Sequence, residues 1–371
     1  MKISIITGPF MCLPPFAIGA IEKRWYNVGN ILSKTNEVYF ISKEPVSKGL
    51  IQSSPSHIYI KGYSRTNSWL KDCFLDLIYS YKALKKAPPS NIVILNSIWS
   101  PILYPLFKKK LKHSLYNVAR FPKKQLGLYH SIDCFSCVSL AVYNNALIQT
   151  PNIKNKLCVI NNPIDTHNFY FKGNRKCSKT PTIVYSGRIH KEKGLDILIS
   201  AINILNNKGF KINLSLIGTK DIAKGGSGDE YVNYLNSLAT SFTINWIEPI
   251  YNPSELADEL NKGDIFCYPS VAEKGETFGV APLEAMGIGL PTIVSDLDCF
   301  KDFVKNEETG LIFNHKSPHA IQLLSEQVLR LIQSDDLYQK LSYRGSEKAK
   351  LFSTENIAND YYKKFLELIH E

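Results

Sequence analysis

The chain has 371 residues, of which 44% are hydrophobic and 21% charged, and a formal net charge of +11. This is the composition of an ordinary globular protein, and the length exceeds the usual size of one hydrophobic core, so we expect two domains. The longest apolar runs have the length of strands, which excludes a transmembrane helix. The N-terminal MKISIITGPF reads as a strand and a loop, without the apolar core and cleavage site of a signal peptide.

The positive charge is concentrated in the N-terminal half, because residues 1–170 carry a net charge of +14 and residues 171–371 a net charge of −3. The basic clusters contain Lys82, Lys85, Lys86, Lys108, Lys109, Lys110, Lys112, Arg120, Lys123 and Lys124. Interleaved apolar residues would let part of this surface lie against an anionic membrane, where each basic residue contributes roughly 1 kcal/mol. A solvated basic face is the alternative. No RNP, KH, zinc-finger or helix-turn-helix signature is present, which argues against a nucleic-acid partner.

Strand-like and helix-like patterns alternate along the chain. Strands are predicted at 2–7, 37–42, 58–63, 91–96, 114–119 and 134–139, and again at 182–187, 212–218, 243–248, 264–270 and 291–296. Helical patterns such as 20–34 lie between them, and turn formers with charges at 159–181 predict a linker. The alternation predicts parallel sheets covered by helices, and therefore two doubly wound α/β domains with a cleft between them.

The eight cysteines are scattered through the chain. Cys134 and Cys137 form a single C-x-x-C in a strand-like setting, with no second pair at zinc spacing, so we interpret them as buried thiols. The cysteine pattern favours a reducing, cytoplasmic compartment.

Two carboxylates, Glu276 and Glu284, bracket a turn and the predicted start of a helix within Gly275–Pro291. Pro282 suits the first helical position, because its missing N–H would have no partner there. Ala281 would then be the cap, and Glu284 would lie in the first turn. The two carboxylates can bracket a ligand in this arrangement. In the alternative interpretation Glu284 complements the helix dipole and Glu276 is solvated.

The backbone amides of Phe278, Gly279 and Val280 are expected at the positive end of the same helix. That position favours an anionic group such as a diphosphate. Gly279 would allow the group to approach the backbone closely.

Arg188 and Lys193 follow the predicted strand 182–187 and precede a helix that opens near Leu195. Loops at the carboxyl ends of parallel strands are where open α/β sheets bind ligands. Arg can clasp a phosphate through two hydrogen bonds, and Lys supplies a point charge. The alternative is that both are solvated loop cations, as we expect for Lys191.

The spacing of Glu276 and Glu284 resembles the E-x7-E motif of the retaining glycosyltransferases of family 4, which have the GT-B fold. The segments 182–202, 264–270 and 291–313 also resemble motifs of that family, in order and in spacing. The resemblance implies two Rossmann-like domains facing a central cleft. Residues 1–170 would form the acceptor domain and residues 171–350 the donor domain, and the helix within 351–371 would cross back to the first domain.

The resemblance also implies the chemistry. A sugar leaves its nucleoside diphosphate, UDP or GDP, while Arg188, Lys193 and the helix amides stabilise the charge on the departing diphosphate, with no metal or other cofactor required. Glu284 would accept hydrogen bonds from the ribose, Glu276 would accept them from the sugar, and Gly218 would lie against the donor. Retention would follow from attack on the same face. The acceptor would be a glycan or a lipid-linked molecule of surface polysaccharide or glycolipid assembly.

Two departures from the family pattern concern the N-terminal half. Gly19 matches the first of the family's paired glycines, which meet the donor and acceptor, but Ala20 replaces the second. The family's histidine near the donor sugar is missing from the corresponding stretch, 114–125. Asn117 or Arg120 would substitute for it, and Arg120 could hold an acidic sugar or acceptor.

Asp296 and Asp298 match the D-x-D pattern that binds a metal in a different glycosyltransferase fold. Their position directly after a predicted strand favours a turn with local hydrogen bonds, so no metal site is predicted.

Two alternatives to a transferase remain open at this point. In a glycosidase, Glu276 and Glu284 would flank the scissile bond as acid and nucleophile. In a catalytically degenerate GT-B subunit, the same pocket would bind a nucleotide or a partner without turnover.

Overall fold

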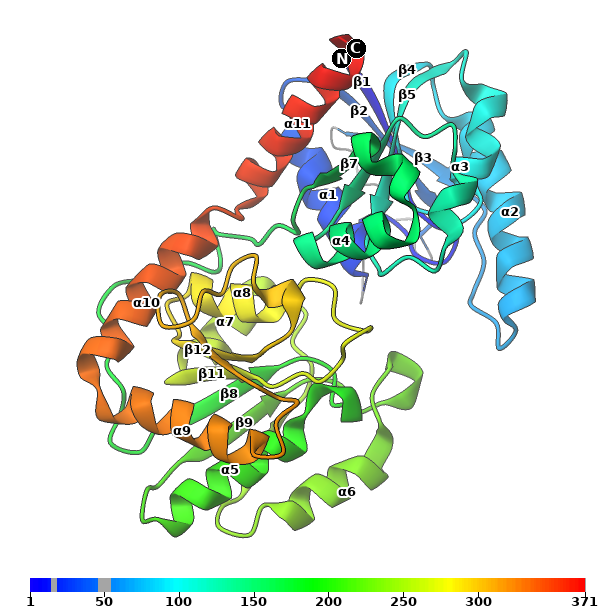
Figure 1. The fold of residues 1–371 in the computed structure, drawn as a ribbon. Coiled ribbons are helices and arrows are strands. Elements are labelled where there is room, and N and C mark those ends of the chain that lie inside the picture. Colours follow the sequence, from blue (N-terminus) through cyan, green and yellow to red (C-terminus); the bar gives the residue numbers. More distant parts are fainter. Residues whose placement is uncertain (15–18, 46–54, 371) are drawn as a thin grey trace. The chain divides into compact units, whose positions relative to one another are not determined.

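The computed structural model describes residues 1–14, 19–45 and 55–370. The chain divides into two compact units (Figure 1), an N-terminal unit of Met1–Pro163 with Thr354–Glu371 and a C-terminal unit of Ile164–Ser353. The sequence placed the corresponding boundaries at residues 170 and 350.

The N-terminal unit is built on one parallel sheet. Within the described residues its seven strands lie in the order β3-β2-β1-β4-β5-β6-β7. The strands are β1 (Lys2–Ile6), β2 (Glu37–Lys43), β3 (Ser56–Ile60), β4 (Ser90–Leu95), β5 (Leu111–Val118), β6 (Cys134–Cys137) and β7 (Leu157–Val159). The helices are α1 (Ala20–Leu32), α2 (Trp69–Lys86), α3 (Ser100–Leu103), α4 (Leu140–Gln149) and α11 (Thr354–His370). Every residue of β1 after Lys2 is buried, as expected for a strand covered on both faces.

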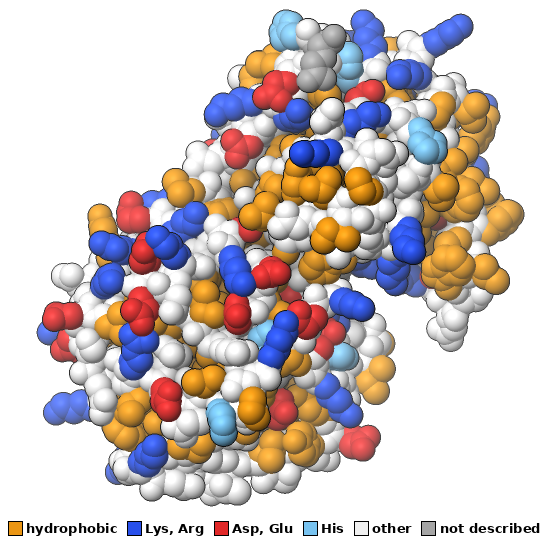
Figure 2. Space-filling model, viewed as in Figure 1, with side chains coloured by type: hydrophobic (Ala, Val, Ile, Leu, Met, Phe, Trp, Pro, Cys, Tyr) orange, Lys and Arg blue, Asp and Glu red, His pale blue; other side chains and the backbone are white. Residues whose placement is uncertain are grey.

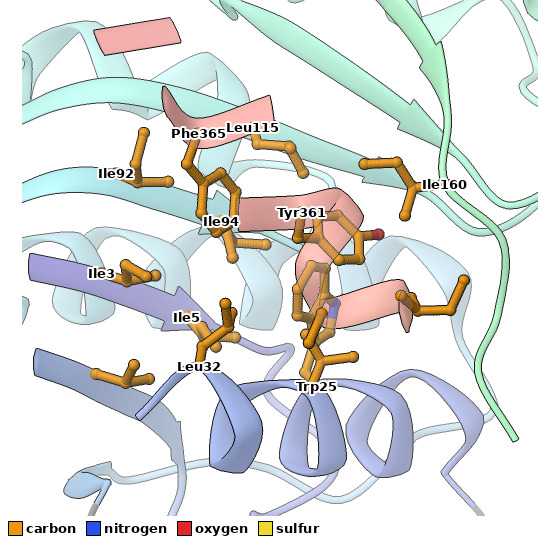
Figure 3. Packing of buried hydrophobic residues seen from close by; sticks show 14 of the residues in the cluster. Ile3, Ile5, Trp25, Leu32, Ile92, Ile94, Leu115, Ile160, Tyr361 and Phe365 are labelled. Atoms are coloured by element: carbon orange, nitrogen blue, oxygen red, sulfur yellow. The ribbon is translucent and has the colours of Figure 1, made fainter. Parts of the chain in front are cut away.

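The core of this unit includes helices from opposite ends of the chain. Trp25 of α1 and Tyr361 of α11 pack with their ring centroids 4.8 Å apart. Figure 3 shows Tyr361 and Phe365 of α11 pointing among Ile94 and Leu115 of the sheet. The last helix of the chain therefore completes the core of the first unit, because its apolar face has the sheet and α1 to pack against.

The C-terminal unit repeats the doubly wound arrangement. Its six parallel strands, all described, lie in the order β10-β9-β8-β11-β12-β13. They are β8 (Thr182–Ser186), β9 (Asn213–Ile217), β10 (Ile244–Ile247), β11 (Ile265–Tyr268), β12 (Thr292–Ser295) and β13 (Leu311–Phe313). The helices are α5 (Leu195–Asn207), α6 (Gly228–Leu238), α7 (Pro253–Asn261), α8 (Val280–Gly287), α9 (Ala320–Gln333) and α10 (Asp335–Lys350). The strand order reverses at β8, so the loops after β8 and β11 open where such sheets bind ligands.

The fold class predicted from the sequence is confirmed, and the predicted strands fall on observed ones. The sequence missed β7 and β13, each of three residues, because so short a run shows no clear period. The third strand was predicted at 58–63 but ends at Ile60. Among the described residues, no helix combines the length and apolarity needed to cross a membrane.

Candidate functional site

The loops after β8 and β9 lie in direct contact at two glycines. The Gly187 amide donates to the Ile217 carbonyl at 2.9 Å. A Cβ added to Gly218 would lie 1.8 Å from the Gly187 carbonyl oxygen, and Gly218 has a φ of +153°. No larger residue fits between the two loops. Gly218, predicted to contact the donor, therefore has a packing role that brings the β8 loop into place.

Arg188 is held at the open edge of the sheet by two partners. Its Nη2 lies 2.8 Å from Glu192 Oε1, and its Nη1 donates to the Gly225 carbonyl at 3.0 Å. The side chain is partly exposed, so its charge is accessible from solvent. Glu192 was not among the predicted site residues, although its spacing of four residues from Arg188 is an ordinary ion-pair spacing.

Lys193 and Glu276 form a buried ion pair. Lys193 Nζ lies 2.6 Å from Glu276 Oε2, and the two side chains are only 6% and 12% exposed. The Tyr268 hydroxyl donates to the same carboxylate oxygen at 3.1 Å, and the ammonium lies 5.3 Å from the centre of the Tyr268 ring. The structure thus brings together two of the predicted catalytic residues and adds Tyr268, which sequence reasoning passed over inside a predicted strand.

Backbone contacts connect the two loops that carry this pair. The Glu192 carbonyl accepts hydrogen bonds from the Val271 amide at 2.9 Å and from the Ser270 hydroxyl at 3.2 Å. The Glu276 amide closes a turn on the Ala272 carbonyl at 2.9 Å. Glu276 therefore lies on a hydrogen-bonded turn that fixes its backbone.

Stacked tyrosines form the floor beneath the ion pair. The rings of Tyr185 and Tyr268 are parallel within 16°, with centroids 5.3 Å apart, and the Tyr185 hydroxyl donates to the Arg188 carbonyl at 2.9 Å. Burial and, after it, the charge of Glu276 raise the pKa of both phenols well above the ordinary value. Both hydroxyls therefore stay protonated and act as hydrogen-bond donors.

The start of α8 corrects a prediction. The helix begins at Val280 with Gly279 as its cap, so Ala281 is inside the helix, Pro282 is its third residue and Glu284 lies beyond the first turn. Proline fits there as well, because the first four helical N–H groups have no partner within the helix. Gly279 has a φ of +88°, and a Cβ there would lie 2.5 Å from the Phe300 ring. The proline indicated a later start of the helix than the left-handed Gly279 sets.

The other predicted donor contacts in this region include buried side chains and backbone amides. The Phe278 side chain is buried against Phe303 and Phe352, with ring centroids 5.3 and 5.9 Å away, so only its backbone can meet a ligand. Glu284 is buried on α8. The amides of 278–280 lie at the N-terminal end of α8, as predicted, where the helix dipole favours an anion.

Gly19 is the cap of α1 in the N-terminal unit, and Ala20 is the first residue of that helix. A Cβ on Gly19 would lie 2.8 Å from Glu22 Oε2. Residues 15–18 of the predicted glycine loop lie outside the described residues.

The two proposed substitutes for the family's histidine have different surroundings. Asn117 is buried on β5, where its Oδ1 accepts from Arg24 at 2.9 Å and its Nδ2 donates to Asn96 at 3.0 Å. Arg120 is exposed in the loop after β5. Both polar ends of the Asn117 amide are therefore used within the protein, whereas Arg120 is available to a ligand.

The D-x-D carboxylates are paired with a lysine. Lys301 Nζ lies 3.1 Å from Asp296 Oδ1 and 2.8 Å from Asp298 Oδ1, on an exposed turn. Across the described ranges, no three His, Cys, Asp or Glu side chains form a group that could hold a metal ion.

Comparison with known proteins identifies the unit that carries the Lys193–Glu276 pair. Residues 167–348 match the family "Glycosyl transferases group 1". The C-terminal unit belongs to this family. Of the site residues described above, Gly19, Asn117 and Arg120 lie in the N-terminal unit, and the others lie in this group 1 unit.

Curated relatives carry transferase names. The chain is 29% identical over 179 residues to the D-inositol 3-phosphate glycosyltransferase of Corynebacterium glutamicum, covering 47% of this chain and 40% of that protein. It is 25% identical over 252 residues to the capsular polysaccharide biosynthesis glycosyltransferase CapM of Staphylococcus aureus, covering 64% of this chain and 63% of that protein. The alignments thus span less than two thirds of these relatives.

Solved structures share the fold over the whole chain. The sucrose-phosphate synthase of Thermosynechococcus elongatus superposes with a TM-score of 0.79 at 17% identity, covering 100% of this chain and 99% of that one. Anabaena HepE, in complex with UDP and glucose, superposes with a TM-score of 0.74 at 15% identity, covering 99% of this chain and 100% of that one. These similarities establish the GT-B fold over the whole chain.

Proposed function

We propose that the protein is a retaining glycosyltransferase that moves a sugar from a nucleoside diphosphate sugar to a glycan or lipid-linked acceptor. The observation that carries this proposal is the buried Lys193–Glu276 pair at the carboxyl edge of the group 1 sheet. The transferase names of the relatives, and a fold neighbour that binds UDP and glucose, support it. The setting we propose is surface polysaccharide or glycolipid assembly.

The roles of the basic residues follow from where charge develops. As the sugar leaves, negative charge builds on the departing diphosphate, and the Lys193 ammonium and Arg188 guanidinium stabilise it. Lys193 is buried, so its field is weakly screened by water. Glu276 neutralises this ammonium and would share it with the diphosphate of a bound donor. The amides of 278–280 add the positive end of α8.

The proposed reaction exchanges one bond for another at the anomeric carbon. The bond from this carbon to the β-phosphate oxygen breaks, and its electron pair leaves with the nucleoside diphosphate. An acceptor hydroxyl attacks the same face, and its proton passes to the departing phosphate oxygen, so the anomeric configuration is retained. Glu276 orients the sugar hydroxyls and Glu284 the ribose, and no covalent intermediate with the protein is involved.

The donor we propose is a UDP- or GDP-sugar, and no cofactor takes part in the reaction. On the acceptor side we propose a contact through Arg120, because this cation is exposed whereas the Asn117 amide is occupied within the protein. An acceptor that carries an acidic group would pair with Arg120.

Nucleotide release from a panel of UDP-, GDP- and ADP-sugars tests the proposal. We expect slow hydrolysis of one donor, lowered about 10²–10³-fold in Lys193→Ala, which removes charge stabilisation of the leaving group. Glu284→Ala should raise the KM for the same donor. The matched control is Lys191→Ala, which removes an exposed lysine two positions away and should leave release unchanged.

The other outcomes separate the alternatives. Cleavage of aryl glycosides without any nucleotide would indicate a glycosidase. Donor binding by calorimetry without release, even with an acceptor extract, would indicate a degenerate binding subunit. Absence of binding to every sugar nucleotide would contradict the site itself.

A further inference from the structure

Helix α2 (Trp69–Lys86) exposes large apolar side chains. Trp69 and Leu70 are each 72% exposed and Phe74 is 60% exposed. Figure 2 shows hydrophobic side chains gathered over the part of the N-terminal unit where Figure 1 places α2. Single exposed apolar residues are common on protein surfaces, but a contiguous group marks a binding surface.

The exposed stripe is separate from the face by which α2 packs on its unit. The buried residues of the helix are Asp76, Tyr79, Ser80, Ala83 and Leu84. Leu70, Phe74 and Tyr81 lie on another side of the helix and are exposed, and Trp69, the first residue of the helix, is exposed at its N-terminal end. A helix with one buried face normally carries polar residues on its outer face. The second apolar face of α2 therefore has no role in the core.

Neighbouring segments extend this surface. The rings of Tyr81 and Phe107 lie 5.8 Å apart, edge to face. Ile102 of α3 and Leu106 of the following turn are also exposed. We call this surface the α2 patch, and it consists of Trp69, Leu70, Phe74, Tyr81, Ile102 and Leu106.

Lysines border the α2 patch. The exposed ones are Lys71, Lys82, Lys85, Lys86, Lys108 and Lys109. Of the two acidic residues of α2, Asp76 is buried, and Asp72 is engaged by the backbone and hydroxyl of Thr66 at 2.9 and 2.8 Å. The charge around the patch is therefore positive, and it complements an anionic surface.

We propose that the α2 patch docks onto an anionic phospholipid bilayer. Tryptophan and tyrosine rings favour the headgroup level of a bilayer, leucine and phenylalanine enter the acyl boundary, and the bordering lysines attract anionic headgroups. A protein partner would fit the apolar residues, but it would not by itself account for the six lysines with so few acidic residues among them. The α2 patch shares no residue with the sugar-nucleotide site, so an experiment can contradict one proposal without contradicting the other.

Co-sedimentation of the full chain with vesicles tests this inference. We expect binding to phosphatidylcholine vesicles that contain about 30% phosphatidylglycerol, and little binding to phosphatidylcholine alone. The variant Trp69→Ser/Leu70→Ser/Phe74→Ser should lower the partition coefficient at least about tenfold. The matched control, Leu128→Ser/Leu140→Ser/Ile148→Ser, changes three exposed apolar residues of the same unit outside the α2 patch and should bind like the wild type.

A second pair of variants tests the charge. Lys82→Gln/Lys85→Gln/Lys86→Gln should weaken binding to the anionic vesicles more than Lys23→Gln/Lys34→Gln/Lys154→Gln, which removes the same charge elsewhere on the unit. Circular dichroism and sugar-nucleotide affinity should be unchanged in all four variants, which excludes misfolding. Equal binding by patch and control variants would overturn the proposal. So would a dimer in sedimentation that only the patch variant dissociates, because the patch would then be an interface between copies.

Discussion

Two buried basic residues, one in each unit, are satisfied in opposite ways. Arg24 in the N-terminal unit donates to neutral oxygens, those of Asn117 at 2.9 Å, the Ile160 carbonyl at 2.9 Å and the Tyr361 hydroxyl. Lys193 in the C-terminal unit pairs with a carboxylate at 2.6 Å. Burial lowers the pKa of Arg24, and the hydrogen bonds named above join it to neutral groups.

The difference indicates which cation can change partners. The neutral acceptors around Arg24 come from α11, from β5 and from the end of β7, so the guanidinium holds three elements of one core together. Lys193 lies on a loop at the carboxyl edge of a sheet, where a phosphate can compete with Glu276 for the ammonium. A cation bound by neutral groups is structural, whereas a cation bound by one carboxylate can be shared with an anionic ligand.

The acidic residues show the same contrast. Asp76 in the N-terminal unit is buried and accepts from the amides of Ile98 and Trp99 at 3.0 and 3.2 Å, and burial raises its pKa to about 6. Glu276 has a cation as its partner. The N-terminal unit thus stabilises buried charges with hydrogen bonds, and the C-terminal site does so with a charge of opposite sign.

The largest effect on activity should come from breaking the Lys193–Glu276 pair. Glu276→Gln keeps the shape of the side chain but leaves Lys193 without its counter-charge. We expect sugar release to fall about 10³-fold, because the sugar loses its charged acceptor. The affinity for the free nucleoside diphosphate should rise, because it no longer competes with a carboxylate.

Calorimetry with the nucleoside diphosphate measures this exchange. Glu273→Gln, an exposed change in the same loop, is the control and should leave both quantities unchanged. A lower affinity for the diphosphate in Glu276→Gln would contradict the exchange of partners.

Removing the structural cation should mainly affect stability. Arg24→Met removes the donor to the buried oxygens of Asn117 and Ile160, at about 1–3 kcal/mol each, so we expect a loss of about 4 kcal/mol in the free energy of unfolding. Urea denaturation followed by tryptophan fluorescence measures it, because Trp25 lies in the same core. Lys23→Met, which changes the exposed neighbour, should lower the free energy of unfolding only slightly. Sugar-nucleotide affinity of the folded variant should be retained, and its loss would show that Arg24 also serves the site.

A smaller effect on stability, which depends on pH, is expected from the titration of the Asp76 carboxyl group. Its pKa is raised from 3.8 to about 6 in the folded protein, so the folded state binds more protons than the unfolded state between these values. Stability should therefore fall as pH rises from about 4 to about 7, by about 3 kcal/mol. Asp76→Asn should abolish this slope and be the more stable protein at neutral pH.

Asp72 on the same helix provides a comparison of opposite sign. Hydrogen bonds from Thr66 lower its pKa, so its contribution to stability is present above the unfolded pKa and is lost as pH falls. Asp72→Asn should therefore lower stability at neutral pH. Urea denaturation across the pH range checks both, and an unchanged slope in Asp76→Asn would refute the effect of burial.

Local patterns in the sequence predicted the fold, and they placed the candidate site in loops that follow predicted strands. Apolar strands that alternate with amphipathic helices predict doubly wound domains, and Arg188, Lys193, Glu276 and Glu284 stand out because charges and glycines follow predicted strands. The predicted start of α8 was wrong because the proline was given more weight than Gly279, which has a φ of +88° and lies so close to the Phe300 ring that no Cβ fits. No pattern near position 280 contains that information.

What the sequence determined by itself is the order of elements and the identity of the charged groups, since both follow from local periodicity and residue chemistry. Only the tertiary structure decided the partners. Tyr268 is 8 residues from Glu276 but Lys193 is 83 away, and Arg24 meets Tyr361 across 337 positions. Such contacts depend on which strands lie side by side and on which helix covers them, and those choices are made by the packing of the whole unit.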